Sequence, residues 1–152
     1  MSVVARLEPN RLDPPHELRA LAEQAHGDGA IVSFVGLARR EASNGGTVEA
    51  LILEHHDTLT RRSLEDIAVA CAEKFAVSHV RVVHRYGEIP AGEPIVFAAA
   101  AALHRRAAFE AADYLMDRLK TEAVLWKWEI GEGGSAWIEP TAADLADRDR
   151  WG

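Results

Sequence analysis

Residues 104–130 read HRRAAFEAADYLMDRLKTEAVLWKWEI and combine the two periodicities on which the expected architecture rests. In the first part, apolar side chains recur at helical spacing and predict a helix over His104–Lys120. The inward-facing positions of that helix are Ala108, Ala111, Ala112, Leu115 and Leu119. Val124–Ile130 instead alternates like a β-strand, with Lys127 on one face and two tryptophans on the other. A helix that leads directly into a strand indicates a mixed fold.

Strands and helices alternate on both sides of this stretch. The clearest helix is predicted over Thr60–Phe75, where apolar residues follow the spacing i, i+3, i+4, i+7. A further helix over His16–Ala25 follows Pro14 and Pro15, which suit a first helical turn. Short apolar runs bounded by turn residues predict strands at Ala30–Gly36, Val48–Leu53, Val80–Val83 and Ile95–Leu103. Loops or turns are expected at Arg40–Gly46, at Gly87–Gly92 and after Gly131, before a short strand through Ile138 and a C-terminal helix.

The composition is that of one globular unit spanning residues 1–152. Hydrophobic residues make up 48% and charged residues 27% of the chain, and no repeat or low-complexity linker divides it. A chain of this length buries about two-thirds of its unfolded surface, so it can fold without a disulfide or a structural metal. It has one cysteine, no apolar run near the roughly 20 residues that cross a membrane, and no secretion-signal pattern at its start. These features predict a cytoplasmic protein.

The basic residues are informative by their position, because the chain as a whole is acidic. Its formal charge of -7 argues against general binding to nucleic acid or anionic membranes, so any anion site must be local. His104, Arg105 and Arg106 stand at a helix start without a Ser, Thr, Asp or Asn cap. The first backbone N–H groups are therefore available for an anion such as phosphate. The alternative is a solvated cluster in which Glu110 pairs with Arg106.

Three further cations are candidates for the same chemistry. Lys120 falls in the last turn of the predicted helix, where a lysine usually only stabilises the helix dipole. Lys127 lies on a strand, where a lysine is most often exposed. Arg39 follows a strand and enters a glycine-containing loop, where both binding residues and solvated arginines occur. The pattern of residues alone leaves the functional and the ordinary interpretation open for each of them.

Other chemistries find little support in the sequence. Cys71 lies on the inward stripe of its helix and is expected to be a small buried hydrophobe rather than a nucleophile. His55, His56 and His84 have no spacing that completes a metal site. The sequence also has no glycine-rich phosphate loop and no Ser-His-Asp constellation in a recognisable context.

Five short motifs follow one another along the chain: Phe34-Val35-Gly36-Leu37-Ala38-Arg39, Leu53-Glu54-His55, His84-Arg85-Tyr86-Gly87-Glu88, His104-Arg105 with Phe109-Glu110-Ala111, and Lys120 through Glu129. Together they resemble the large, catalytic subunit of molybdopterin synthase over roughly residues 28–139. The resemblance implies an α+β fold, an α/β hammerhead-type single domain with a small additional β subdomain. Three residues depart from the family pattern: Val124 replaces a proline, Trp128 a basic residue, and Pro140 an arginine. The last two changes are expected to reduce the positive charge of the pocket.

The resemblance also implies a reaction and its partners. In this family a homodimer of large subunits binds one small ubiquitin-like subunit at each end, which makes a heterotetramer. The C-terminal Gly-Gly thiocarboxylate of the small subunit supplies two sulfurs in turn to cyclic pyranopterin monophosphate, which becomes molybdopterin, and no cofactor or metal takes part. On this basis Lys120 is the main catalytic residue and Lys127 the second. Arg39, His104 and Arg105 would hold the substrate phosphate or the thiocarboxylate, because fixed positive groups stabilise anions.

Two interpretations from other functional classes stay open at this point. A non-catalytic module that binds a phosphorylated metabolite and regulates a partner would use the same basic cluster without chemistry at Lys120. A purely structural dimerisation subunit would leave Arg39, His104 and Arg105 without a reason to converge. Lys120 separates an enzyme from a regulatory module, because only the enzyme needs this amine for turnover.

Overall fold

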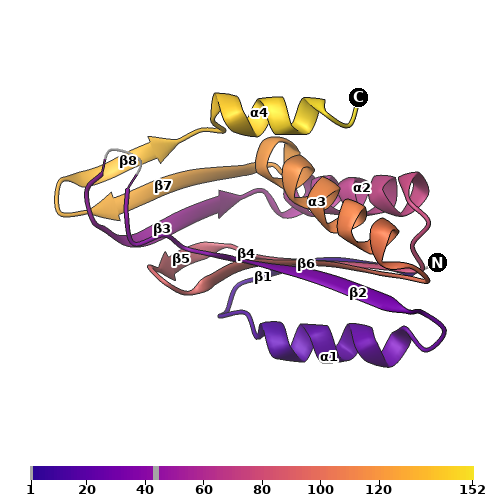
Figure 1. Ribbon diagram of the computed structural model, residues 1–152. Helices are drawn as coiled ribbons and strands as arrows, with labels where there is room; N and C mark the ends of the chain where they lie inside the picture. Colours follow the sequence, from indigo (N-terminus) through magenta and orange to yellow (C-terminus); the bar gives the residue numbers. More distant parts are fainter. Residues whose placement is uncertain (1, 43–44) are drawn as a thin grey trace.

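The computed structural model describes residues 2–42 and 45–152, which form two four-stranded sheets and four helices. Figure 1 shows the helices gathered around the first sheet, while the second sheet extends to one side. The loop predicted over Arg40–Gly46 contains residues 43 and 44, which lie outside the described residues. The predicted α+β class is confirmed, and the second sheet corresponds to the small additional β subdomain.

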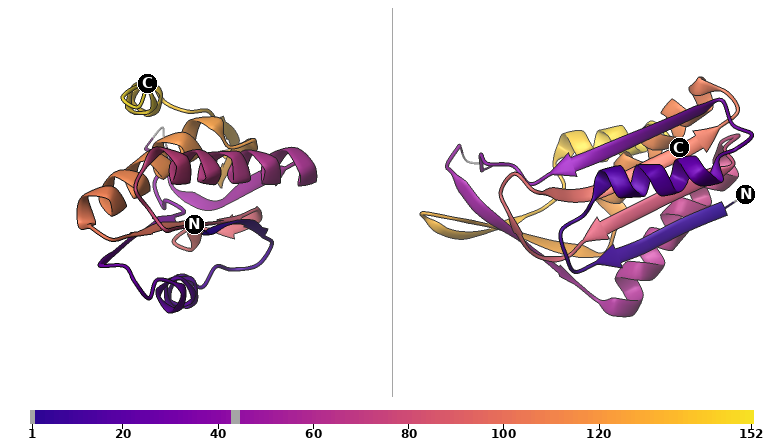
Figure 2. Two further views of the ribbon diagram at one scale, coloured as in Figure 1. Left: turned by 90° about the vertical axis from the view of Figure 1, so that its right-hand side faces the viewer. Right: turned by 90° about the horizontal axis from the view of Figure 1, so that it is seen from below.

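The first sheet has the strand order β1-β4-β6-β2. These strands are β1 (Ser2–Glu8), β4 (His79–Arg85), β6 (Pro94–Ala102) and β2 (Ala30–Leu37). β1 pairs with β4 in parallel, and the other neighbours are antiparallel. Helices α2 (Asp57–Lys74) and α3 (Arg105–Glu122) cover one face of this sheet, while α1 (Pro14–Gln24) covers the other, as Figure 2 shows.

Strand β6 lies at the centre of the core. Its alternate residues pack in two clusters, Val96, Ala98 and Ala100 with α2 and α3, and Phe97, Ala99 and Ala101 with Leu21 of α1. Successive side chains of a strand point to opposite faces, so a run of alanines allows both helical layers to approach the sheet closely. The predicted strand over Ile95–Leu103 is therefore confirmed, and it lies between two closely packed helical layers.

The second sheet has the order β5-β3-β7-β8, and all its neighbours are antiparallel. Its strands are β5 (Gly87–Pro90), β3 (Val48–His55), β7 (Leu125–Gly131) and β8 (Gly134–Ile138). A small cluster of Ala38, Leu53 and Ile89 is buried against it. Helix α4 (Ala142–Asp149) follows β8 and packs on α3. Within the described part of the chain, no helix has the length and apolar character needed to span a membrane.

Two strands differ from the sequence-based expectation. Residues Ser2–Glu8 form β1, although charged side chains interrupt the apolar pattern, because they pair along their whole length with β4. Arg6 in this strand donates two hydrogen bonds, of 2.9 and 2.6 Å, to Glu17 of α1. The segment Gly87–Pro90, expected as a turn, forms the short strand β5 beside β3. Both segments depend on partners that are distant in the sequence, which periodicity within a segment does not reveal.

Cys71 lies in the core between α2 and α3, as its helical spacing predicts. Its side chain is fully buried, and its thiol donates a weak hydrogen bond of 3.6 Å to the carbonyl of Ala111. Burial raises the pKa of the thiol to about 12. The reactive thiolate is therefore scarce near neutral pH, so this cysteine has a structural and not a chemical role.

We expect Cys71→Ala to lower the free energy of unfolding by about 1 kcal/mol, because loss of the sulfur leaves a small cavity in the core. Urea denaturation of both proteins measures this difference. In the same experiment the wild-type thiol should react with a thiol reagent only as the protein unfolds. Rapid labelling of the native protein would contradict the buried placement.

His84 is a buried imidazole at the end of β4. Its Nδ1 atom lies 2.9 Å from the carbonyl oxygen of Arg85, to which it can donate a hydrogen bond. Burial lowers the pKa of His84 to about 4; the hydrogen bond to Arg85 opposes this shift, and the positive charge of Lys127 adds to it. The ring is therefore neutral in the folded protein at pH 7.

This shift predicts an acid sensitivity of the fold. Between the ordinary histidine pKa, about 6.5, and the folded value, the unfolded chain binds a proton that the folded chain does not, so stability falls as pH falls. For His84 the loss from pH 7 to pH 4.5 is about 2 kcal/mol. We expect His84→Gln to remove that part of the pH dependence, measured by urea denaturation at both pH values. If the free energies of unfolding of the two proteins fell equally between pH 7 and pH 4.5, His84 would not be the source of this pH dependence.

Candidate functional site

The junction between α3 and β7 brings Lys120 and Lys127 to one place. Helix α3 ends at Glu122 and β7 begins at Leu125, so only two residues separate the helix from the strand. Side chains of α2 hold this junction. The buried Thr60 hydroxyl donates to the carbonyl of Val124 at 2.6 Å, and Ser63 Oγ accepts from the Val124 N–H at 3.1 Å.

Lys127 points to the side of the second sheet on which Arg39 also emerges. Lys127 pairs with Leu53 across β3 and β7, and side chains of paired residues share a face. Leu53 is buried against Ala38, the residue that precedes Arg39. The packing of this small apolar cluster therefore places Arg39 close to Lys127.

Three other charged residues act on the amine of Lys127. Burial lowers the pKa of Lys127, and the positive charges of Lys120 and Arg39 lower it further, while the carboxylate of Asp144 acts in the opposite direction. A lysine with a lowered pKa can exchange a proton near neutral pH more readily than a solvated one. The arrangement can therefore bind an anion and assist proton transfer.

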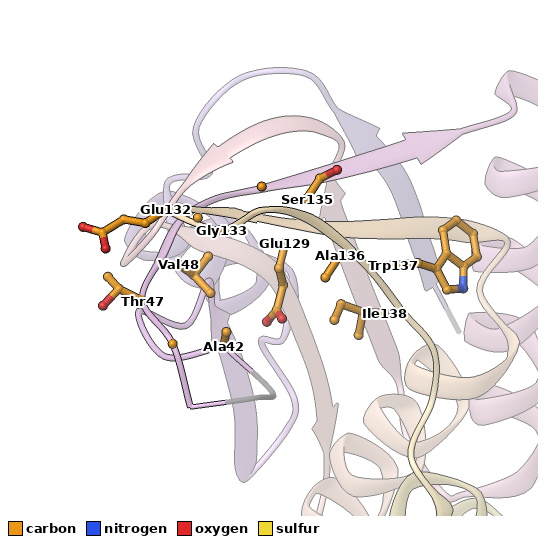
Figure 3. A pocket seen from close by; sticks show the side chains of 13 residues that line it. Ala42, Thr47, Val48, Glu129, Glu132, Gly133, Ser135, Ala136, Trp137 and Ile138 are labelled. Atoms are coloured by element: carbon orange, nitrogen blue, oxygen red, sulfur yellow. The ribbon is translucent and has the colours of Figure 1, made fainter.

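A groove leads from the tip of the β7–β8 hairpin toward these residues. It encloses about 440 Å³ and is lined by the hairpin and by the described ends of the loop before β3. Figure 3 shows Glu129, Ala136 and Ile138 beside Ala42. Glu129 is two residues along β7 from Lys127, and Ile138 pairs with Lys127 across the hairpin. The wall of the groove thus includes neighbours of Lys127 on both strands of the hairpin.

His104 and Arg105 lie at the opposite end of α3 from Lys120. His104 is the N-cap residue and makes no side-chain cap hydrogen bond, as the sequence predicts. From Arg105 to Lys120 the helix rises by about 22 Å, at about 1.5 Å per residue. One chain therefore does not bring His104 and Arg105 to the lysine pair. In residues 2–42 and 45–152, no ion pair joins Arg106 to Glu110 either.

The departures from the family pattern have different structural consequences. The Val124 N–H donates to Ser63, and a proline at this position could not make that bond. Trp128 packs edge-on against Trp137, with ring centroids 4.9 Å apart, on the face of the sheet opposite to Lys127. A basic residue at position 128 would therefore point away from the pocket. Pro140 lies in the link between β8 and α4.

Asp144 belongs to the site but was not anticipated from the sequence. It is the N3 residue of α4, where Thr141 and Asp144 form a reciprocal capping box. The spacing Thr-x-x-Asp before a helix is a recognisable signal for such a cap, but only the packing of α4 brings it to the lysines. No group of three or more His, Cys, Asp or Glu residues suited to a metal ion occurs within the described residues.

The comparisons with known proteins agree on one family. The family model described as MoaE protein matches residues 7–122. A molybdopterin synthase catalytic subunit from Caulobacter vibrioides is 50% identical over 123 residues, which cover 81% of this chain and 80% of the relative. A protein of the same name from Pseudomonas aeruginosa is 39% identical over 146 residues, 96% of this chain and 97% of the relative.

A solved structure extends this agreement to the whole fold. The molybdopterin biosynthesis MoaE protein from Burkholderia ambifaria superposes with a TM-score of 0.83 and 34% sequence identity, covering 100% of this chain and 99% of the other. The matched region holds the α3–β7 junction and the second sheet as well as the first. The chain therefore belongs to the MoaE family, whose relatives are molybdopterin synthase catalytic subunits.

Proposed function

We propose that this protein is the catalytic subunit of a molybdopterin synthase and transfers two sulfurs to cyclic pyranopterin monophosphate. The sulfur comes from the C-terminal thiocarboxylate of a small ubiquitin-like subunit. The observation that carries this proposal is that the positive charges of Lys120 and Arg39 both act on the half-buried amine of Lys127. The substrate phosphate and the thiocarboxylate are both anions, and fixed cations in a partly desolvated pocket stabilise them and the charge that develops in transfer.

Lys120 is the main catalytic residue in this proposal, and Lys127 is the second. Lys120 acts as a nucleophile or as a proton-transfer group, because an amine can do either once it is deprotonated. Lys127 positions the anion and stabilises its charge. The guanidinium of Arg39 can bind a phosphate or a thiocarboxylate with two parallel hydrogen bonds. The fully buried Cys71 is not needed, since the sulfur arrives on the partner.

The groove beside the β7–β8 hairpin suits the extended tail of the small subunit. Its walls include Gly46, Gly131, Gly133 and Gly134, which leave the backbone accessible. A tail that ends in two glycines is itself narrow enough to follow such a path. Ile138 in the wall of this groove pairs with Lys127 across the hairpin, so a tail lying in the groove would run toward the lysine pair.

We further propose that His104 and Arg105 serve the pocket of a second copy of the chain. Strand β2 is an edge strand of the first sheet, and it exposes Phe34 and Leu37, the latter by 55%. At the start of α3, Leu103 and Phe109 are exposed by 62% and 58%. Exposed apolar side chains along an unpaired strand edge are typical of a subunit interface. A homodimer through this surface would bring the basic start of one α3 toward its partner.

The role of Lys120 is tested by single-turnover conversion of cyclic pyranopterin monophosphate with a thiocarboxylated small subunit. We expect Lys120→Ala to lower the rate by a factor on the order of one hundred or more, with folding and small-subunit binding nearly intact. Lys120→Arg should also be slow, because guanidinium stays protonated. Lys127→Ala should have a milder effect, and the exposed Lys74 provides the matched control. Near-normal conversion by Lys120→Ala would favour the non-catalytic module instead.

The contribution of a second copy is tested by mixing two inactive variants, Lys120→Ala and Arg105→Ala. If each pocket combines Lys120 of one copy with Arg105 of the other, random exchange restores one intact pocket in each mixed dimer. We then expect about a quarter of wild-type activity, since about half of the dimers are mixed and each has one of two pockets intact. If both residues served the pocket of their own chain, mixing would restore nothing.

A further inference from the structure

Helix α4 runs antiparallel to the C-terminal half of α3. Arg148 donates to Glu122 near the end of α3 at 3.0 Å. Further along the chain, Arg150 and Trp151 both donate to Asp117, at 2.6 and 2.8 Å. Later residues of this segment thus meet earlier residues of α3. It follows that the start of α4 lies beyond the end of α3, over the junction with β7.

The path of the chain from β8 leads to the same place. Ile138 pairs with Lys127, and Thr141, three residues later, caps α4. Asp144 precedes Arg148 by four residues, so both lie on one face of the helix. Because Arg148 reaches Glu122, that face is turned toward α3, and Asp144 faces the junction between Lys120 and Lys127.

The carboxylate of Asp144 is held in one orientation. Its Oδ2 accepts a hydrogen bond of 2.9 Å from the Thr141 N–H, while its own N–H donates to Thr141 Oγ1 at 3.0 Å. Partial burial acts to raise the pKa of Asp144, but the hydrogen bonds with Thr141 and the charges of Lys120 and Lys127 outweigh it, and the pKa is lowered. The carboxylate is therefore ionised at neutral pH.

Lys127 is surrounded by charged and titratable groups from every element that packs around it. Lys120 comes from the last turn of α3, Arg39 from the segment after β2, and the neutral ring of His84 from β4. Glu129 lies on the same strand and face. Among these groups, the cations Lys120 and Arg39 lower the pKa of Lys127, whereas the carboxylate of Asp144 on α4 raises it.

We propose that Asp144 is a positioning residue of this site, whose capped carboxylate acts across the end of α3 to keep the half-buried amine of Lys127 cationic beside Lys120. The inference rests on the proposed function only in that it assigns these lysines to sulfur transfer. Without Asp144, Lys127 would lose its proton at lower pH, and the pocket would hold its anionic ligands less well. Asp144 itself contacts no reacting atom, so it acts through the lysines.

The chain offers a direct test, because its only lysines are Lys74, Lys120 and Lys127. NMR of protein labelled with carbon-13 at lysine Cε follows each amine through a pH titration without any substrate, and single Lys→Arg variants assign the three signals. We expect Asp144→Asn to lower the titration midpoint of Lys127 by about half to one pH unit. Lys74, on the surface of α2, should be unaffected.

Three variants separate charge from structure. Asp147→Asn makes the same charge change at an exposed position of α4 and should leave Lys127 unshifted. Thr141→Ala removes a cap hydrogen bond but keeps the carboxylate, and Asp144→Glu keeps the charge, so both should retain most of the wild-type midpoint. An unchanged Lys127 midpoint in Asp144→Asn overturns the proposal. An equal shift in Thr141→Ala also overturns it, because the helix cap would then be responsible.

Single-turnover rates against pH connect this coupling to the reaction. A loss of rate at alkaline pH that follows deprotonation of Lys127 should move to lower pH in Asp144→Asn, by the shift found in the titration. An alkaline limb that does not move would overturn the positioning role. If instead no variant of Lys120 or Lys127 affects the rate, the proposed function fails, whereas the substrate-free titration still decides the coupling.

Discussion

The hydrogen bonds between α2 and Val124 are the constraint on which the site depends. Thr60 binds the carbonyl of Val124 and Ser63 binds its N–H, so both polar groups of one peptide position are satisfied by a helix some 60 residues earlier in the chain. Buried backbone groups are costly when unpaired, and these two bonds keep the chain from taking another path between α3 and β7. The distance between the two lysines follows from that path, and so does the position of the second sheet against the first.

The distribution of charge explains how an acidic chain maintains a basic pocket. Many of its arginines are paired with carboxylates: Arg6 and Arg81 share the buried Glu17, Arg85 binds Glu93 at 2.8 Å, and Arg148 and Arg150 bind residues of α3. These cations contribute little potential beyond their partners. In the described residues, no carboxylate lies within ion-pair distance of Arg39, Lys120 or Lys127. The positive charges of these three residues are therefore not cancelled by a direct ion pair, and the carboxylate of Asp144 acts on the two lysines from a greater distance.

The sequence predicts well those elements whose burial has a clear period. The helices around Cys71 and Leu115, the alanine-rich strand and the alternating strand around Lys127 appear where expected, because their inward residues also pack in the structure. β1 and β5 could not be predicted, since pairing with distant strands stabilises them. The same limit applies to the site. The motifs name Lys120, Lys127 and Arg39, but the convergence of these residues and the position of Asp144 depend on how α4 and the small Ala38 cluster pack.

The alanine run of β6 also has a consequence for how this molecule can change over evolutionary time. The alanines of β6 separate the first sheet from the helices on its two faces. Because each alanine side chain is a single carbon atom, it sets the distance between the sheet and those helices. Replacing any of these alanines with a larger residue would push a helix away from the sheet at a cost of about 1 to 3 kcal/mol. Since α3 is one of those helices and carries Lys120 in its last turn, a larger side chain in β6 would also displace Lys120. We therefore expect these alanines to drift as slowly among relatives as the lysines themselves, although they touch no ligand.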